Sequence, residues 1–188
     1  EDCSGAPDDA AATCDAGLAG AQDPADLAHA VDLCPAAFAA PAWHVQSAAV
    51  LRANALGLPE AGQYAVRASF GGYLPQVGGA LVVLSTGAAA PTGATGFTAF
   101  QPGLTNGTTS AFPEDWLAAN GGALPVAPGC PSPLGAQAYD PVMFQLYLRV
   151  PTNARALRLK AAFLSSEFPE WICGPYNDFF VVLLDSAH

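Results

Sequence analysis

Three carboxylates and an amide gather in one short stretch of a chain in which charged residues are scarce. The segment SSEFPEWICGPYND (165–178) contains Glu167, Glu170, Asn177 and Asp178 and lies between two strongly apolar runs. Calcium takes oxygen ligands from carboxylates, amides and backbone carbonyls at about 2.3–2.6 Å. One bound cation would also offset the repulsion among the three carboxylates. The four residues are therefore predicted metal ligands, with calcium as the cofactor.

Two other interpretations of these acids stay open. They can be a solvated connection whose polar side chains cap turns. They can also be the acid and base of a glycoside hydrolase, which need to flank the sugar bond that is cleaved. Glu167 and Glu170 stand three residues apart on one loop, which makes the hydrolase the weakest of the three hypotheses.

Other catalytic chemistry has no support in the sequence. The three histidines are His29, His44 and His188, and no GxSxG, HExxH, P-loop or GxGxxG motif is present. No cysteine and histidine show the spacing of a nucleophile and its base. The chain is therefore predicted not to be an enzyme.

Charge and hydropathy exclude two classes of partner. The net charge is −10, with only six Lys and Arg residues among 188. Binding to the phosphates of nucleic acid, or to an anionic membrane surface, requires clustered cations. No apolar run reaches the ~18–20 residues of a membrane-spanning helix, so membrane insertion is not expected either.

The cysteines indicate an exported protein with disulfides. There are five, none in a CxxC pair: Cys3, Cys14, Cys34, Cys130 and Cys173. A zinc site is poorly supported by this spacing, whereas disulfides are common in secreted domains. We predict the bridges Cys3–Cys14 and Cys130–Cys173, which leave one thiol over. Because the chain begins at Glu1 without a methionine, removal of a signal peptide is expected.

The N-terminal part divides into an acidic lead-in and one helix. Residues 1–22 are predicted to form an acidic segment held by a disulfide. The β-sandwich domain is predicted to follow at 23–188. Asp23 is a predicted N-cap and Pro24 suits the first helical position. The helical face comprises Leu27, Ala30, Val31 and Cys34, and Pro35 ends the run.

Strand patterns dominate the rest of the domain. The expected strands lie within residues 43–53, 63–70, 79–86, 144–150, 156–164 and 178–185. In the fifth, Leu157, Leu159, Ala161 and Phe163 alternate with polar residues and should face inward. The turn PTNA (151–154) should join the fourth and fifth strands as a hairpin. We predict an all-β fold, an antiparallel β-sandwich of jelly-roll type with one short N-terminal helix and long Gly/Pro-rich loops.

The C-terminal segment also resembles a known family. RVPTNARALRLKAAFLSSEFPEWICGPYNDFFVVLLDS (149–186) is similar to the choice-of-anchor L domain of secreted bacterial proteins, whose pattern looks like S-x-E-[FY]-P-E followed by [FY]-N-D-x-F. LVVLSTGAA (81–89) and the stretch from 14 to 34 resemble myxobacterial-type members.

This resemblance implies export, a β-sandwich, and attachment to the cell surface or matrix through one of several unrelated C-terminal anchors. It implies no known enzymatic activity. Family members usually continue past NDFFVVLLDS with more strands, whereas this chain ends at Ala187-His188. The sheet is therefore expected to lack its last strands, which another chain would supply by strand addition.

We accordingly expect a secreted, non-enzymatic structural or adhesive module of the cell surface, which self-assembles through strand addition and has a calcium-stabilised loop. Its partners would be other copies of itself or another surface protein chain. The alternative is a calcium-dependent carbohydrate- or ligand-binding sandwich, in which Trp43, Trp116, Trp171 and the run YNDFF form a glycan platform.

Overall fold

Strands in small antiparallel sheets make up most of the regular structure. The computed structural model describes residues 14–34, 43–76, 78–133, 135, 137–166, 169–174 and 177–186. Its elements, in chain order, are α1 (Pro24–His29), β1 (His44–Leu51), the 3-10 turn η1 (Ala61–Gln63), β2 (Tyr64–Arg67), β3 (Leu81–Leu84), β4 (Thr109–Ala111), α2 (Glu114–Ala119), β5 (Gln137–Tyr139) and β6 (Met143–Arg149). The predicted all-β class is confirmed; the jelly-roll arrangement stays a prediction.

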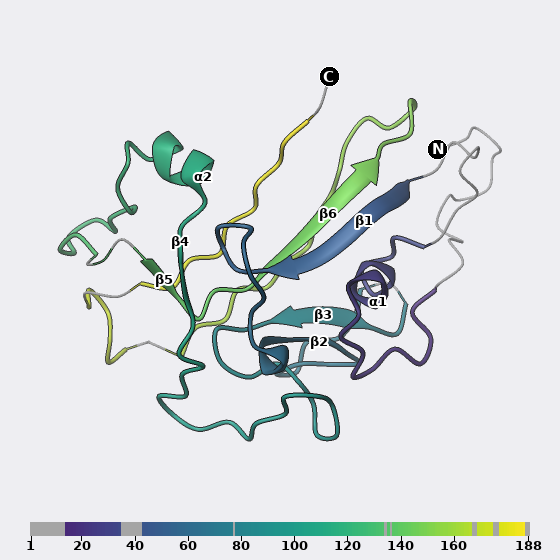
Figure 1. The fold of residues 1–188 in the computed structure, drawn as a ribbon, viewed down its shortest axis with the longest axis horizontal. Helices are drawn as coiled ribbons and strands as arrows, with labels where there is room; N and C mark the ends of the chain where they lie inside the picture. Colours follow the sequence, from purple (N-terminus) through teal and green to yellow (C-terminus); the bar gives the residue numbers. More distant parts are fainter. Residues whose placement is uncertain are drawn as a thin grey trace.

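The described strands form three two-stranded antiparallel sheets (Figure 1). The longest joins β1 to β6, with His44 opposite Arg149 and Leu51 opposite Met143. The β2–β3 sheet lies beside it, and β4 pairs with β5 near α2. Strands were predicted correctly at β1, β2, β3 and β6, whereas β4, β5 and α2 were not predicted.

The core lies where α1 meets β1 and β2. Its buried members are Leu27, Ala30, Val50, Val66 and Ala80, and Phe144 of β6 packs against them. These apolar side chains come from five elements or their ends and exclude water together, at roughly 25 cal/mol for each Å² of apolar surface removed from solvent. The predicted inward face of α1 is confirmed for Leu27 and Ala30.

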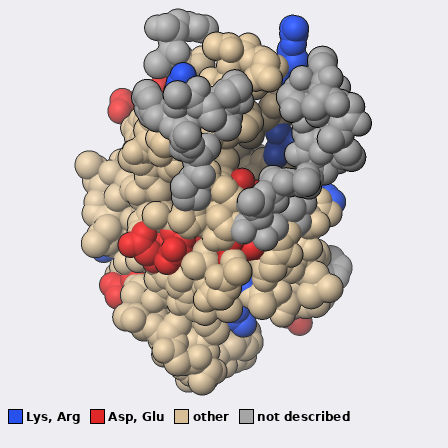
Figure 2. All heavy atoms as spheres, turned by 90° about the vertical axis from the view of Figure 1, so that its right-hand side faces the viewer, with Lys and Arg blue, Asp and Glu red and all other residues tan. Residues whose placement is uncertain are grey.

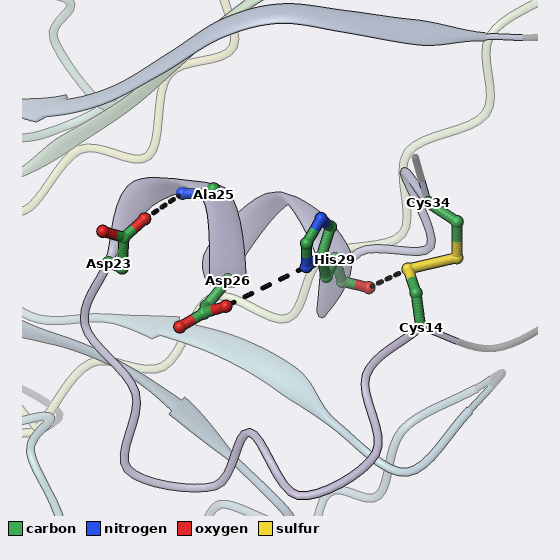
Figure 3. Close-up of polar contacts among 6 residues, drawn as sticks. All are labelled: Cys14, Asp23, Ala25, Asp26, His29 and Cys34. Atoms are coloured by element: carbon green, nitrogen blue, oxygen red, sulfur yellow. Dashed lines mark hydrogen bonds and ion pairs between the residues drawn. A yellow bond between two sulfur atoms is a disulfide. The ribbon is translucent and has the colours of Figure 1, made fainter. Parts of the chain in front are cut away.

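Local sequence signals place α1, and a disulfide ties its end to the lead-in (Figure 3). Asp23 Oδ1 accepts a hydrogen bond from Ala25 N at 2.8 Å, as an N-cap should. Cys14 is bonded to Cys34, and Cys14 Sγ lies 3.8 Å from the carbonyl oxygen of His29.

The predicted Cys3–Cys14 pairing is therefore wrong, although Cys3 itself lies outside the described residues. The helix ends at His29, and the turn after it, in which Asp32 has φ 64°, returns the chain to Cys14. Cys34, and not Cys3, is therefore the partner of Cys14.

The described end of the lead-in is hydrogen-bonded into the domain. Asp15 is 3% exposed, and its Oδ2 accepts hydrogen bonds from the backbone N–H groups of Gly79 and Ala80 at 2.7 and 2.8 Å. Gly20 N donates to Val66 O, and Val66 N donates to Ala21 O. Residues 14–22 thus close over β2 and the turn that precedes β3.

A buried polar centre joins the turns on the other side of β2. The fully buried side chain of Gln63 donates to Asp140 O at 2.7 Å and accepts from Glu60 N at 2.8 Å. The Asp140 carboxylate in turn accepts hydrogen bonds from Thr105 Oγ1, Asn106 N, Thr108 N and Thr108 Oγ1. One carboxylate therefore holds the whole turn 105–108, because each of its oxygens satisfies two donors.

The last two predicted strands, 156–164 and 178–185, are not assigned as strands in the structure. The turn at 151–154 does form, with Ala154 N bonded to Pro151 O, but β6 pairs with β1 and not with 156–164. Leu157, Leu159 and Phe163, predicted to be buried, are more than half exposed. The predicted hairpin is therefore wrong, since a local turn does not by itself decide which distant strand becomes the partner.

The two segments nevertheless lie against each other in register. Ser165 Oγ donates to Asp178 Oδ2 at 3.1 Å, and the rings of Phe163 and Phe180 stack with centroids 6.4 Å apart. From the pair Ser165–Asp178 to the pair Phe163–Phe180, the residue number falls by two in the first segment and rises by two in the second. This is the side-chain pairing of antiparallel neighbours, without an assigned ladder between them.

Candidate functional site

The structure brings part of the predicted metal-ligand set together. Asn177 and Asp178 line one hollow, and Glu170 lies exposed on the turn 169–173. Glu167 lies outside the described residues. Among the residues that the structure describes, no three His, Cys, Asp or Glu side chains are placed to share a metal ion. The calcium site stays a prediction, because one of its four ligands is not described.

A disulfide positions the loop that carries these residues. Cys130 is bonded to Cys173, as the sequence predicted. The turn closes with a hydrogen bond from Gly174 N to Trp171 O at 2.9 Å, and Cys173 adopts a positive φ of 58°. The bridge thereby fixes the loop 169–174 against the segment that precedes β5.

Next to this bridge lies a hollow of about 380 Å³. Three polar side chains lie at it, those of Ser165, Asn177 and Asp178, and the Ser165–Asp178 hydrogen bond links two of them. Its remaining lining is apolar: Pro125, Val126, Ala127, Phe163 and Phe179. The hollow is an open depression that combines an apolar wall with a few hydrogen-bonding groups.

Aromatic contacts hold Phe179 in this wall. Its ring meets that of Trp116 edge-on at a centroid distance of 5.5 Å and that of Phe112 at 6.2 Å. Phe112 and Trp116 are themselves 5.6 Å apart. Edge-to-face pairs at such distances contribute roughly 0.5–1.5 kcal/mol each beyond burial. Trp116, which the sequence suggested as a glycan platform, instead supports Phe179 from beside the hollow.

A second hollow of about 250 Å³ continues the first. The two share Ala127, Ser165 and Asn177 as lining residues, so they adjoin. The second is also lined by the bridge Cys130–Cys173, by Ile172, and by Trp171, whose side chain is 66% exposed. We call the two hollows together the C-terminal groove.

Sequence reasoning identified the polar residues of the C-terminal groove and, through Trp171 and the run YNDFF, part of its aromatic wall. Asn177, Asp178 and Trp171 were singled out, whereas Phe163 was assigned to a buried strand face and Pro125–Ala127 to a long loop. The one usable signal was the predicted Cys130–Cys173 bridge, since a bridge brings both loops to one place.

The acidic pair at the lead-in is electrostatically distinct from the groove. Partial burial of its carboxyl, and then the negative charge of Asp15, raise the pKa of Asp32 above its ordinary value of 3.8. Asp15 follows Cys14 and Asp32 lies two residues before Cys34, so both carboxylates lie at the Cys14–Cys34 bridge.

Comparison with protein-family models, curated proteins and solved structures found no match to this chain. The resemblance to the choice-of-anchor L domain therefore stays a prediction. No helix in the described part of the chain is long and apolar enough to cross a membrane. The two disulfides are compatible with an extracellular location.

Proposed function

We propose that the chain is a secreted, non-enzymatic structural or adhesive module of the cell surface or extracellular matrix, which assembles with further copies of itself by exchanging its C-terminal strand. The single observation that supports this most is the in-register but ladder-free contact between 156–164 and 178–185. In the assembly, residues 178–185 of one copy would form backbone hydrogen bonds with residues 156–164 of the next copy. The added strands would enlarge the sheets, as the predicted jelly-roll sandwich requires.

Exposure of both segments supports strand exchange. Every residue from 155 to 166 is exposed, and Phe180, Val182 and Leu184 are each more than half exposed. An apolar strand pattern without a ladder is a ready template for another chain, since its backbone groups gain partners by pairing. Exchange of an identical element between copies is a low-cost route to an assembly.

Charge complementarity favours a second copy of this chain as the partner. In the register set by Phe163 opposite Phe180, Arg158 comes opposite Asp185. Opposite charges across a strand pair contribute roughly 0.2–1 kcal/mol, and apolar pairs such as Leu159 with Leu184 contribute similar amounts. One copy therefore offers the cationic segment and the next the acidic one.

The surface is compatible with this function. Figure 2 shows a face on which most atoms belong to neither acidic nor basic residues, with acidic side chains gathered near its middle. Only 12% of the residues of the chain are charged. Few charged groups have to be desolvated when copies associate, which reduces the cost of burying such a surface.

Calcium is part of the proposal through the segment 165–178. Glu167, Glu170, Asn177 and Asp178 would supply carboxylate and amide oxygens, the ligands that calcium prefers. A cation there would neutralise acids at the point where the chain enters 178–185, and so favour the strand conformation of that segment.

The test is a disulfide trap between copies. One preparation carries Ala161→Cys and another Val182→Cys, residues that face each other in the observed register, both in a Cys3→Ser background. Directly opposite Cβ atoms lie about 4.5–5.5 Å apart, close to what a disulfide spans. Mixing and mild oxidation should give a covalent dimer of twice the 19.0 kDa chain mass.

The matched control replaces Val182→Cys by Leu183→Cys, which points to the opposite face and should trap far less dimer. Light scattering on the unsubstituted chain should show concentration-dependent assembly that EDTA reverses and added calcium restores. A chain that stays a 19.0 kDa monomer and gives no mixed dimer would refute the assembly. Assembly that is indifferent to EDTA would remove calcium from the proposal.

A further inference from the structure

We infer that the C-terminal groove binds an uncharged oligosaccharide, with Asp178 and Asn177 bonded to sugar hydroxyls and the rings of Phe163, Phe179 and Trp171 against the faces of the sugar rings. The groove is present in the single chain, and in an exchanged assembly 177–179 of one copy would complete the same groove against 163–165 of the next. This proposed site differs from the sequence-based alternative in needing no calcium, and in giving Trp116 a supporting position.

The apolar walls match one face of a pyranose ring. A sugar ring presents C–H groups on its faces and hydroxyls around its edge, so it fits a site in which aromatic and polar side chains alternate. Phe163 and Phe179 line the first hollow, and Trp171 lines the second. The ring of Phe179 is held by Trp116 and Phe112, so this part of the aromatic surface is in place before a ligand arrives.

The polar groups match the edge of the ring. An ionised carboxylate only accepts hydrogen bonds and has about four lone-pair positions, whereas an amide both donates and accepts. Ser165 takes up one position of Asp178, on Oδ2. The other positions of Asp178 can receive sugar hydroxyls, and hydrogen bonds to a charged group are the stronger kind.

Charge selects uncharged sugars. No Lys or Arg is among the described residues that line the two hollows, whereas the carboxylate of Asp178 is. The chain as a whole carries a net charge of −10. A uronic acid, sulfate or phosphate group in the groove would meet a like charge with no compensating cation.

The length of the groove selects more than one sugar unit. Two adjoining hollows, of about 380 and 250 Å³, each have at least one aromatic residue of their own. A monosaccharide can occupy one hollow, whereas an oligosaccharide can contact both, so affinity should increase from one to several units.

The experiment is calorimetric titration of the full chain, in EDTA, with uncharged hexasaccharides of glucose, mannose and N-acetylglucosamine, and with hexagalacturonate as the anionic counterpart. At least one uncharged hexasaccharide should bind saturably, and hexagalacturonate should not. Asp178→Asn should weaken binding about 10–100-fold, the size expected for hydrogen bonds to a charged group. Asp32→Asn, the same charge change at the Cys14–Cys34 bridge and outside the groove, should leave it unaltered.

A second variant tests the length of the site. Trp171→Ala, at an exposed side chain, should weaken hexasaccharide binding about tenfold and disaccharide binding in the first hollow much less. Absence of binding by all three uncharged hexasaccharides at millimolar concentration would overturn the inference, as would equal binding by Asp178→Asn and the unsubstituted chain. Asn177 and Asp178 are also the proposed calcium ligands, and the titration in EDTA keeps calcium away from them. Assembly is measured separately by the disulfide trap, so failure of one proposal is distinguishable from failure of the other.

Discussion

Replacement of Asp140 by asparagine tests how much one buried carboxylate contributes to the stability of the turn 105–108. The Asp140 side chain is 6% exposed and accepts four hydrogen bonds from Thr105, Asn106 and Thr108. Its backbone has φ 47°, a left-handed conformation that asparagine tolerates as well as aspartate does. Asp140→Asn therefore changes the acceptor chemistry and leaves the backbone conformation allowed.

The size of the effect follows from counting donors. In asparagine an NH₂ group replaces one of the two carboxylate oxygens. Whichever oxygen is replaced, the NH₂ group faces two hydrogen-bond donors that have lost their acceptor. The hydroxyls of Thr105 and Thr108 can rotate away, but the N–H of Asn106 on Oδ2, or that of Thr108 on Oδ1, cannot. One buried N–H without a partner costs roughly 1–3 kcal/mol, and the remaining bonds weaken when their acceptor loses its charge. We expect a loss of about 3 kcal/mol in the free energy of unfolding.

The assay is urea unfolding followed by far-UV circular dichroism at neutral pH and 25 °C. Glu114→Gln, at an exposed carboxylate, is the control and should lie within about 0.5 kcal/mol of the unsubstituted chain. The midpoint should move while the dependence on urea stays the same. An Asp140→Asn variant as stable as the control would show that the turn 105–108 does not depend on this carboxylate.

Two further predictions concern Asp32 and Gly78, which lie next to Asp15 of the lead-in. The pKa of Asp32 is raised in the folded chain, so ionisation of Asp32 destabilises the fold. This destabilisation begins at about pH 3.8 and is complete above the raised pKa. Asp32→Asn should therefore raise the melting temperature at pH 7 and not at pH 3. An equal rise at both values would contradict this cause. Gly78→Ala should cost well over 1 kcal/mol, because Gly78 has φ +70° and an added Cβ would lie 2.3 Å from Asp15 Oδ2. Gly121→Ala, at φ +72° in open space, measures the backbone part alone, and equal losses would show that Asp15 moves freely.

Elements with local signals could be predicted from the sequence. The helix α1 begins where Asp23 and Pro24 require it to, since an N-cap and a first-turn proline act within a few residues. Alternation predicted β6 at 144–150, one residue from its observed bounds, and β1 was expected within 43–53, where it spans His44–Leu51. Their pairing with each other has no local signal, because residues 44–51 and 143–149 meet across most of the chain.

The site could be predicted only where a covalent or local constraint applies. The Cys130–Cys173 bridge was predicted correctly, but a choice among five cysteines has no physical basis until the helix returns Cys34 to Cys14. The walls of the C-terminal groove come from three separated stretches, 125–127, 163–165 and 177–179. These three stretches come together through tertiary packing, and neither composition nor periodicity of a single stretch predicts which other stretch it contacts.

The two disulfides enclose separate, successive rings of chain, 14–34 and 130–173, which do not interleave. A protease cut between residues 130 and 173 opens one ring but leaves both pieces covalently joined. A cut between 52 and 129 lies outside both rings and leaves the two halves held by non-covalent contacts, chiefly the β1–β6 pairing. Mass spectrometry without reductant would therefore distinguish the two positions: a gain of one water in the first case, and two separable fragments in the second.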